Sequence, residues 1–394
     1  MRRAAVRAYR PPLILVGALL VTGALASGFM IWVTLTANSY GDFAVHHDSA
    51  RALWEGGDLY MTSGSRPGLQ NRNPPHMLVL LSPLGLLPIR EAMVVWLAIT
   101  FVAMAACTRL WARVLPPGWG VFVFAILFAS VAGYGNLRFG NQAWVTAVAV
   151  TWAWIAWRDG RHRPAAMVLG VVASIKLFVL IVLPYLCWRR HWRAAAWFVA
   201  AGIGITLVGV ATCGLGAYQS WVATMHQQAW QGLPLNVSLL GTLTRALEMH
   251  PSGLTPLMVR PSWIVPLWAV GCAGIVGWLW WVLRDREDAD RDFAALLVSM
   301  LLISPAGWAY YFPLAAGPLA ATAVRTRSPL WIGGLICGLL PYAALSAGPP
   351  AAWSTVTLAS AYMWSGVLLL GATCLNGPRH GADPAALTNP MTRI

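Results

Sequence analysis

The sequence predicts an all-α membrane protein that crosses the bilayer many times, and three observations carry this prediction. Of the 394 residues, 58% are hydrophobic and only 10% are charged, whereas a soluble globular domain carries about 25% charged residues. The apolar residues form a series of runs, several of them near the ~20 residues that a membrane-spanning helix needs. The 27 basic residues, all but one of them arginine, gather in short groups between those runs. That spacing is typical of positively charged cytoplasmic loops.

The same composition excludes several other classes of protein. A soluble enzyme would need more charge on its surface, and a nucleic-acid-binding protein would cluster its basic residues on one soluble face or helix. The six cysteines lie scattered in mostly apolar sequence, with neither metal-ligand nor CxxC spacing, so they predict no disulfide framework. We expect no metal, no cofactor and no nucleic-acid partner.

The first apolar run covers residues 13–36 and follows four arginines. A cleavable signal peptide is the alternative, because Ala24-Leu25-Ala26 resembles a cleavage site. However, a signal core has only about 7–15 apolar residues. The run therefore favours a retained first helix whose N-terminus lies in the cytoplasm.

The arginine groups that follow mark cytoplasmic loops. Two segments, 164–188 and 293–324, have such a group at both ends, and each is interrupted near its middle, by Lys176 or by Ser304-Pro305-Ala306-Gly307-Trp308. We expect each to be a pair of short broken helices whose tip approaches the outer face, because irregular backbone at membrane depth must line protein or a watery cavity. Simple spans are expected near 91–110, 119–134, 143–157, 194–213, 262–283, 329–346 and 353–374, which gives about 10–12 helices in all.

The remaining segments fix the expected organisation. Residues 1–375 form one membrane domain with outer loops at 37–75 and 214–260, and a polar cytoplasmic tail covers 376–394. The acids between Asp285 and Asp292 alternate with arginines, so we interpret them as a solvated cytoplasmic cluster. The acids expected on the outer side are Asp42, Asp48, Glu55, Asp58 and Glu248.

The first outer loop predicts a helix at the membrane interface, because Phe43, Ala50, Leu53 and Trp54 recur at helical spacing. Asp48, Arg51 and Glu55 are spaced for ion pairs on the helix surface. Asp42 begins this helix directly after the first span. It would serve either as the helix N-cap or as a carboxylate that meets a substrate at the membrane surface.

A short apolar run follows, from Met77 to Leu87, between Pro74-Pro75 and Pro88. It is too short for an ordinary span. We expect a re-entrant or half-membrane helix that shapes a cavity.

Several motifs now combine into a family resemblance. They are Gly41-Asp42-Phe43 with His47 and Gly57-Asp58-Leu59-Tyr60, then Asn73-Pro74-Pro75, Phe139-Gly140-Asn141-Gln142, Ala173-Ser174-Ile175-Lys176, Asn236-Val237-Ser238-Leu239-Leu240-Gly241 with Arg245, and Ser304-Pro305-Ala306-Gly307-Trp308. In this order, over residues 38–312, they resemble glycosyltransferase family 87. These are polyprenyl-phosphate-dependent GT-C enzymes, and they include mycobacterial phosphatidylinositol-mannoside mannosyltransferases.

The resemblance implies a GT-C-like bundle with its active site on the outer face of a bacterial plasma membrane. The implied donor is a polyprenyl-phosphate sugar, commonly mannose, and the implied acceptor is a lipid or a glycan. The family's catalytic aspartate maps onto Asp42. One departure is that some members carry histidines after the Ser-Pro-x-x-Trp stretch, where this chain has Tyr310-Tyr311.

Inverting transfer from a lipid phosphate needs a base for the acceptor hydroxyl and cations for the departing phosphate. Asp42 is the candidate base. The candidate phosphate ligands are Lys176, Arg138 and Arg245. Lys176 would alternatively snorkel to an interface, but a lone ammonium at bilayer depth costs at least about 2.5 kcal/mol, which favours a ligand role. Arg138 would alternatively anchor a helix end.

The candidate substrate-binding residues are His46, His47, Asn141, Gln142, Asn236, Ser238, Trp308 and Tyr310. Asn236-Val237-Ser238 also matches the N-glycosylation pattern, although we interpret it as polar lining of the second outer loop. A metal site at His46, His47 and His76 is the alternative to substrate hydrogen bonding. A transporter or flippase for a lipid-linked sugar is the rival function, because it would share broken helices and an intramembrane cation.

Overall fold

The computed structural model describes residues 10–60, 71–225, 231–247, 262–285, 287–326, 328–346 and 352–375. Within these ranges the chain is helical and forms no strand, so the prediction of an all-α polytopic membrane protein is confirmed. The α-helices are α1 Leu13–Thr36, α2 Gly41–Glu55, α3 Pro75–Leu81, α4 Ile89–Val114, α5 Trp119–Ala129, α6 Val131–Phe139, α7 Ala143–Arg158, α8 His162–Ile175, α9 Val182–Trp188, α10 Trp192–Met225, α11 Leu239–Leu247, α12 Ile264–Leu283, α13 Ala289–Ile303, α14 Pro313–Ala323, α15 Pro329–Leu339, α16 Tyr342–Ser346, α17 Ala352–Val356 and α18 Ala361–Leu375. Short 3-10 turns are η1 Ser82–Leu86, η2 Leu177–Ile181, η4 Ala309–Tyr311 and η5 Leu358–Ser360.

Five segments of the described chain are long and apolar enough to cross a membrane by themselves, namely α1, α4, α10, α12 and Ser354–Leu375. A sixth crossing is formed if α5 and α6 count as one span, although they bend by 58°. The apolar segment expected near 119–134 is therefore bent at Ser130, which ends α5 and caps α6 by accepting from the Ala132 amide. The expected total of 10–12 helices stays a prediction, because the other bundle helices are shorter.

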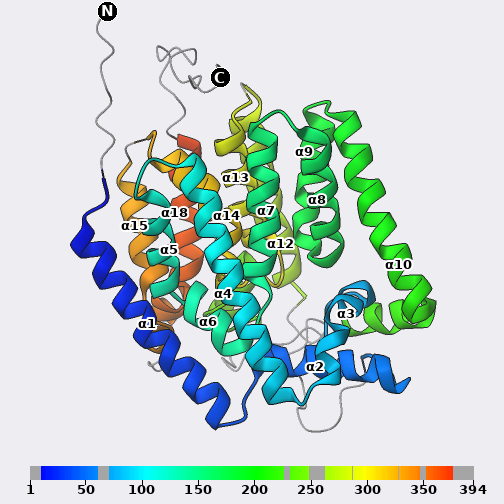
Figure 1. The fold of residues 1–394 in the computed structure, drawn as a ribbon. Coiled ribbons are helices and arrows are strands. Elements are labelled where there is room, and N and C mark those ends of the chain that lie inside the picture. The colour runs from blue at the N-terminus through cyan, green and yellow to red at the C-terminus, as the bar shows by residue number, and fades with distance from the viewer. Residues whose placement is uncertain are drawn as a thin grey trace, which may run out of the picture.

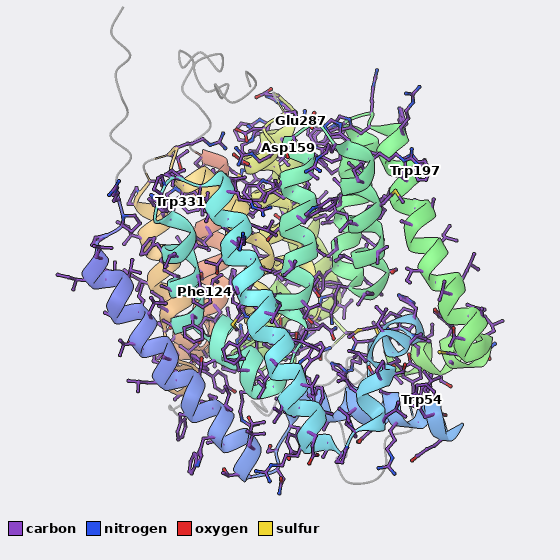
Figure 2. All side chains as sticks on the ribbon, viewed as in Figure 1. Trp54, Phe124, Asp159, Trp197, Glu287 and Trp331 are labelled. Atoms are coloured by element: carbon purple, nitrogen blue, oxygen red, sulfur yellow. The ribbon has the colours of Figure 1, made fainter. Side chains whose placement is uncertain are left out.

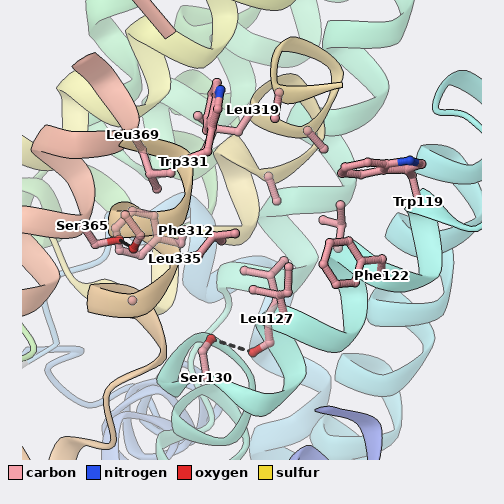
Figure 3. A pocket seen from close by; sticks show the side chains of 17 residues that line it. Trp119, Phe122, Leu127, Ser130, Phe312, Leu319, Trp331, Leu335, Ser365 and Leu369 are labelled. Carbon is pink, nitrogen blue, oxygen red and sulfur yellow. Dashed lines mark hydrogen bonds between the residues drawn. The ribbon is translucent and has the colours of Figure 1, made fainter. Parts of the chain in front are cut away.

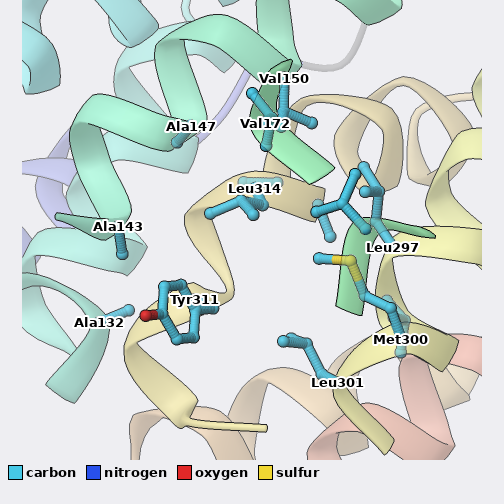
Figure 4. Close-up of a cluster of buried hydrophobic side chains, with 14 of the residues drawn as sticks. Ala132, Ala143, Ala147, Val150, Val172, Leu297, Met300, Leu301, Tyr311 and Leu314 are labelled. Carbon is cyan, nitrogen blue, oxygen red and sulfur yellow. The ribbon is translucent and has the colours of Figure 1, made fainter. Parts of the chain in front are cut away.

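Figure 1 shows the arrangement of these helices: α1 and α10 lie on opposite flanks of the bundle, and α2 and α3 lie across one end. Between the flanks, α7, α13 and α14 form the centre. In Figure 4, small side chains of α7 such as Ala143 and Ala147 face Leu314 of α14 and Leu297 of α13. Small residues at helix interfaces let the backbones approach closely, which is how helices pack when lipid removes the usual hydrophobic driving force.

One end of the bundle, here called the arginine end, joins the helices that the sequence predicted to return. Arg158 is the last residue of α7 and lies 3.3 Å from Asp290 of α13, and Arg325, after α14, lies 3.4 Å from the same carboxylate. Arg189, after α9, lies 3.3 Å from Asp292. Asp159 and Glu287 lie at this end and Trp54 at the other (Figure 2). The segments 164–188 and 293–324 thus leave the arginine end and return to it, as predicted.

The acids of the arginine end correct one interpretation. Asp290 is 5% exposed and Asp292 is fully buried, so these two carboxylates are not part of a solvated cluster. The returning helices enclose the first turn of α13 and supply partners: Trp154 donates to Asp290 at 3.0 Å, and the Tyr185 hydroxyl donates to Asp292 at 2.7 Å. Alternation with arginine was a sign of pairing as much as of solvation.

The second outer loop, expected over about 214–260, stays a prediction. α10 continues to Met225 after a break at Gly214, and its last turns lie against the 71–76 segment. Trp221 donates to the Arg72 carbonyl at 3.0 Å, and His76 Nδ1 lies 3.0 Å from the Tyr218 hydroxyl. This part of α10 holds the segment that precedes α3 in place. The candidate acid Glu248 and the polar tail lie outside the described residues.

The predicted helix of the first outer loop forms as α2. Arg51 and Glu55 pair at 2.6 Å on its exposed side and Trp54 is exposed, whereas Phe43 and Ala50 are buried against the bundle. The short run after it forms α3 and η1, too short to span. α2 and α3 thus cover one end of the bundle, here called the cavity end.

Candidate active site

A cavity of about 660 Å³ opens at the cavity end. Three connections between helices contribute to its lining. They are the turn between α6 and α7, the turn between α8 and η2, and the segment between α13 and α14. Its lining residues are Asp42, Val45, His46, Arg72, Asn73, Asn141, Ile175, Lys176, Leu177, Phe178, Ile181, Trp221, Met225, Trp268, Val276, Met300, Ile303, Ser304, Pro305, Ala306, Trp308, Tyr310 and Tyr311. The structure thus brings six of the predicted site residues together: Asp42, His46, Asn141, Lys176, Trp308 and Tyr310.

Two of the motifs interlock through their glycines. Gly41 has φ +54°, and a Cβ there would lie 2.9 Å from Phe139 Cα; Gly140 has φ +63°, and its Cβ would lie 2.4 Å from Phe43 Cβ. Each glycine therefore receives the phenylalanine of the other motif, and only glycine adopts this backbone without strain. The contact sets the start of α2 against the end of α6, beside the next residues in each motif, Asp42 and Asn141.

We expect Gly140→Ala to destabilise the protein by about 2–4 kcal/mol, since it adds backbone strain to overpacking against Phe43. The measurement is thermal unfolding of the detergent-solubilised protein. Gly56→Ala is the matched control, because Gly56 has φ +70° but nothing within 4 Å of its added Cβ. Equal losses for both variants would show that the interlock contributes nothing beyond backbone strain.

Asp42 lies in the first turn of α2 and is not its N-cap, which is Tyr40 without a side-chain capping bond. Its Oδ2 accepts from Asn141 Nδ2 at 2.9 Å. Burial raises the pKa of the Asp42 carboxyl above its usual value, while the Asn141 hydrogen bond and the charges of Lys176 and Arg72 act in the opposite direction. The result is a carboxylate with a raised pKa on a cavity wall, which is what a general base requires.

Lys176 ends α8 and breaks the helix at the tip of its hairpin. Its Nζ donates to Asn73 Oδ1 at 3.0 Å and lies 5.2 Å from the centre of the Tyr311 ring. Asn73 also accepts from Gln142 Nε2 at 2.8 Å. The ammonium is therefore held inside the cavity by an amide and a ring, and it does not snorkel away from it.

The rest of the cavity wall is aromatic and aliphatic. Trp308 and Tyr310 stack with their ring centroids 5.9 Å apart, and Phe178 packs edge-on against Tyr311. Another part of the wall is formed by apolar side chains from η2, α12 and α13, namely Ile181, Val276, Met300 and Ile303. The cavity thus combines a charged end with an extended apolar wall.

Arg138 lies elsewhere than expected. It does not line the cavity; its guanidinium donates to the Ser39 carbonyl and to Ser39 Oγ at 3.0 Å, and it lies 3.4 Å from Thr34 Oγ1. These contacts fasten the end of α1 to α6. They match the alternative that the sequence left open, a helix-end anchor.

Arg245, Asn236 and Ser238 also lie outside the cavity lining. Arg245 is buried and donates to the carbonyls of Leu233 and Asn236, at 2.7 and 3.0 Å. Asn236 in turn donates to the Pro305 carbonyl at 3.0 Å, and Ser238 Oγ accepts from the Gly241 amide. This network fixes the backbone that carries Trp308, so the three residues shape the cavity from behind.

The histidines do not converge on one point. His47 Nε2 lies 2.9 Å from the Leu87 carbonyl, His76 pairs with Tyr218, and of these three residues only His46 lines the cavity. Within the described ranges, no group of three or more His, Cys, Asp or Glu side chains is placed to hold a metal ion.

Sequence reasoning assigned no role to Arg72, Asn73 and Tyr311, although all three line the cavity. Arg72 and Asn73 stand in the polar run directly before the short proline-flanked helix, and that position was the available signal. In the sequence, Tyr311 stands out only as a departure from the family pattern. Its contact with Lys176 depends on two hairpin tips that are 135 residues apart in the sequence.

A second cavity, of about 240 Å³, lies among α5, α14, α15 and α18 (Figure 3). Its walls are apolar, with Trp119, Phe122 and Trp331 among them. Ser130 and Ser365 are its hydroxyl-bearing residues, and they donate to the carbonyls of Leu127 and Gly334. Among the described residues its lining includes no charged side chain, whereas the larger cavity is lined by Asp42, Arg72 and Lys176.

Comparison with known proteins now adds independent information. The profile of Glycosyltransferase family 87 matches residues 72–305, more than half of the chain. The match covers Asn73, Asn141 and Lys176, and it begins after Asp42. No curated protein matches the chain.

Proposed function

The chain belongs to glycosyltransferase family 87 and is a membrane glycosyltransferase, and we propose that its donor is a polyprenyl-phosphate sugar. The sugar we propose is mannose, and the acceptor a lipid or a glycan. We further propose a GT-C-like mechanism with inversion at the transferred sugar. The arginine end would face the cytoplasm by the positive-inside rule, and we propose that the cavity opens on the outer side of a bacterial plasma membrane.

The observation that carries this proposal is the composition of the larger cavity. Asp42, Lys176 and Arg72 line the same space as an apolar wall from η2, α12 and α13. A polyprenyl-phosphate sugar likewise has a polar part and an apolar part, because a charged phosphate and a sugar stand at one end of a hydrocarbon chain. A soluble nucleotide sugar would gain nothing from the apolar wall.

The proposed reaction begins with the acceptor hydroxyl at Asp42. The carboxylate takes the hydroxyl proton as the acceptor oxygen attacks the anomeric carbon of the donor sugar. The bond between that carbon and the phosphate oxygen breaks, and its electron pair leaves with the lipid phosphate. Lys176 stabilises the departing anion, since a buried cation is most effective where water is excluded. The aromatic wall of Trp308 and Tyr310 offers flat surfaces for the sugar ring.

The proposal is tested by sugar transfer in membranes that contain the protein, with radiolabelled polyprenyl-phosphate mannose as donor. We expect labelled lipid or glycan product in membranes with the wild-type protein and none in membranes lacking it. Polyprenyl-phosphate arabinofuranose serves as a second donor. Absence of transfer from every polyprenyl-phosphate sugar tried would contradict the proposal and favour a transporter or flippase.

Lys176→Met is expected to raise the KM for the donor by about 10–100-fold, because a hydrogen bond to a charged group contributes about 1.5–3 kcal/mol. The measurement is initial rate against donor concentration at saturating acceptor. Arg190→Met is the matched control, since Arg190 is an exposed cation at the root of the same hairpin. An unchanged donor KM in Lys176→Met would remove the phosphate role from this residue.

The pH profile should show the raised pKa of Asp42. A general base works only when ionised, so kcat/KM should fall as the pH drops through that pKa. Because burial raises the pKa, we expect the acidic limb above the ordinary aspartate value of about 3.9. Rates that stay constant down to about pH 4 would contradict this expectation.

A further inference from the structure

The amide of Asn73 has a fixed orientation. Its oxygen accepts from Lys176 Nζ at 3.0 Å and from Gln142 Nε2 at 2.8 Å. An ammonium group can only donate, so the atom that faces Lys176 must be oxygen. The amide nitrogen therefore faces the other way, toward Asn71 Oδ1 at 3.1 Å and His46 Nδ1 at 3.4 Å.

This orientation determines the tautomer of His46. The Asn73 nitrogen can only donate, so His46 Nδ1 must accept and carries no proton. Burial and the nearby charge of Lys176 lower the pKa of His46 to about 3, which keeps the imidazole neutral. A neutral imidazole carries a single N–H proton, and because Nδ1 has none, this proton is on Nε2.

The Nε2–H group of His46 is buried beside the cavity and has no hydrogen-bond partner among the described residues. His46 is 6% exposed and lines the cavity one helical turn after Asp42. A buried donor that makes no hydrogen bond carries a free-energy penalty. A ligand oxygen in the cavity would recover that free energy.

We propose that Asn73 is a positioning residue. It fixes His46 as a hydrogen-bond donor to the phosphate group of the polyprenyl-phosphate sugar. The Asn73 side chain contacts both His46 and Lys176. The imidazole N–H and the ammonium group are therefore held at the same part of the cavity. A phosphate offers several oxygens and a negative charge to a neutral N–H and an ammonium together, which a sugar hydroxyl does not. This inference rests on the proposed function for the identity of the ligand but not for the tautomer.

The tautomer is tested by NMR on the full-length protein in detergent, labelled with ¹⁵N-histidine. Comparison with His46→Gln identifies the His46 signals. We expect an unprotonated Nδ1 and a protonated Nε2 in the wild type, and the reverse in Asn73→Asp, whose carboxylate can only accept. Asn71→Asp makes the same chemical change two residues away and should leave His46 unchanged. A protonated Nδ1 in the wild type, or no change in Asn73→Asp, overturns the proposal.

The phosphate role is tested by the donor KM. Asn73→Asp should raise it about 10-fold or more, through the lost hydrogen bond to a charged oxygen. In His46→Gln the amide supplies an N–H that does not depend on Asn73, so adding Asn73→Asp to His46→Gln should raise the KM much less. Equal effects of Asn73→Asp in both backgrounds would overturn the phosphate role. If the tautomers behave as expected but the wild type transfers no sugar, the proposed function fails and the tautomer assignment stands.

Discussion

Asp42→Asn is expected to lower the rate of sugar transfer by about 10²–10⁴-fold, the contribution of a general base. The amide keeps the size of the side chain but cannot take the acceptor proton. Asn141 would still lie beside it, so the α2–α6 contact should persist and the protein should fold normally. The measurement is kcat in membranes with equal amounts of folded protein, judged by its thermal unfolding.

Asp48→Asn provides the matched control for this experiment. Asp48 is on the same helix, but its side chain is 40% exposed and lies outside the cavity lining. We expect its transfer rate to remain close to that of the wild type. If Asp42→Asn kept the wild-type rate, or if both variants lost activity equally, Asp42 would not be the base.

Asp292→Ala is expected to lower the free energy of unfolding by about 3–5 kcal/mol, the usual loss when one partner of a buried ion pair is removed. The carboxylate is fully buried and accepts from Tyr185 at 2.7 Å, from Arg291 at 3.0 Å and from Arg189 at 3.3 Å. Without it, Arg291 of α13 and Arg189 of the turn after α9 would lose the carboxylate that both of them contact. Thermal unfolding in detergent measures the loss.

Asp285→Ala is the comparison for that prediction. Asp285 is 77% exposed, and its pair with Arg284 spans 3.8 Å. Exposed pairs of this kind contribute about 0–1 kcal/mol, so we expect little change. Equal destabilisation by the two variants would show that burial of the arginine-end pairs has no special weight.

Much of the fold was predictable because lipid limits what a sequence can do. Hydropathy located α1 to the residue, and it placed α4, α7, α10 and α12 within a few positions of their observed starts. The arginine groups identified the returning hairpins, since charge at both ends of an apolar segment allows few alternatives. The bend at Ser130 was missed, because a single serine in an apolar run does not by itself indicate a break.

The charged residues were harder to interpret than the apolar ones. Spacing could not distinguish Arg138, which fastens α1 to α6, from a cation that faces the cavity. Similarly, alternation of acids and arginines before α13 suggested solvation, whereas Asp292 is buried between returning helices. Burial of a charge depends on which helices surround it, and that information is tertiary.

The sequence predicted only part of the candidate site, because the position of a polar side chain also depends on tertiary structure. Asp42, His46, Asn141 and Lys176 belong to motifs that the resemblance quoted, and they meet in the larger cavity. Asn73 belongs to such a motif too, but its importance comes from contacts with three elements far apart in the chain. Only the assembled hairpin tips show it as the residue that connects Lys176 with His46.

The lengths of α8 and α13 have a consequence for where the proposed reaction takes place. α8 has 14 residues and α13 has 15, so at 1.5 Å per residue each is about 21–23 Å long. The hydrocarbon core of a bilayer is about 30 Å thick. Lys176, at the far end of α8, therefore lies below the level of the lipid headgroups when the arginine end is at the opposite surface. The phosphate of a lipid donor must then be drawn inward, or the bilayer must thin around the cavity end. Hydrophobic thickness of the surrounding membrane thus becomes a determinant of turnover.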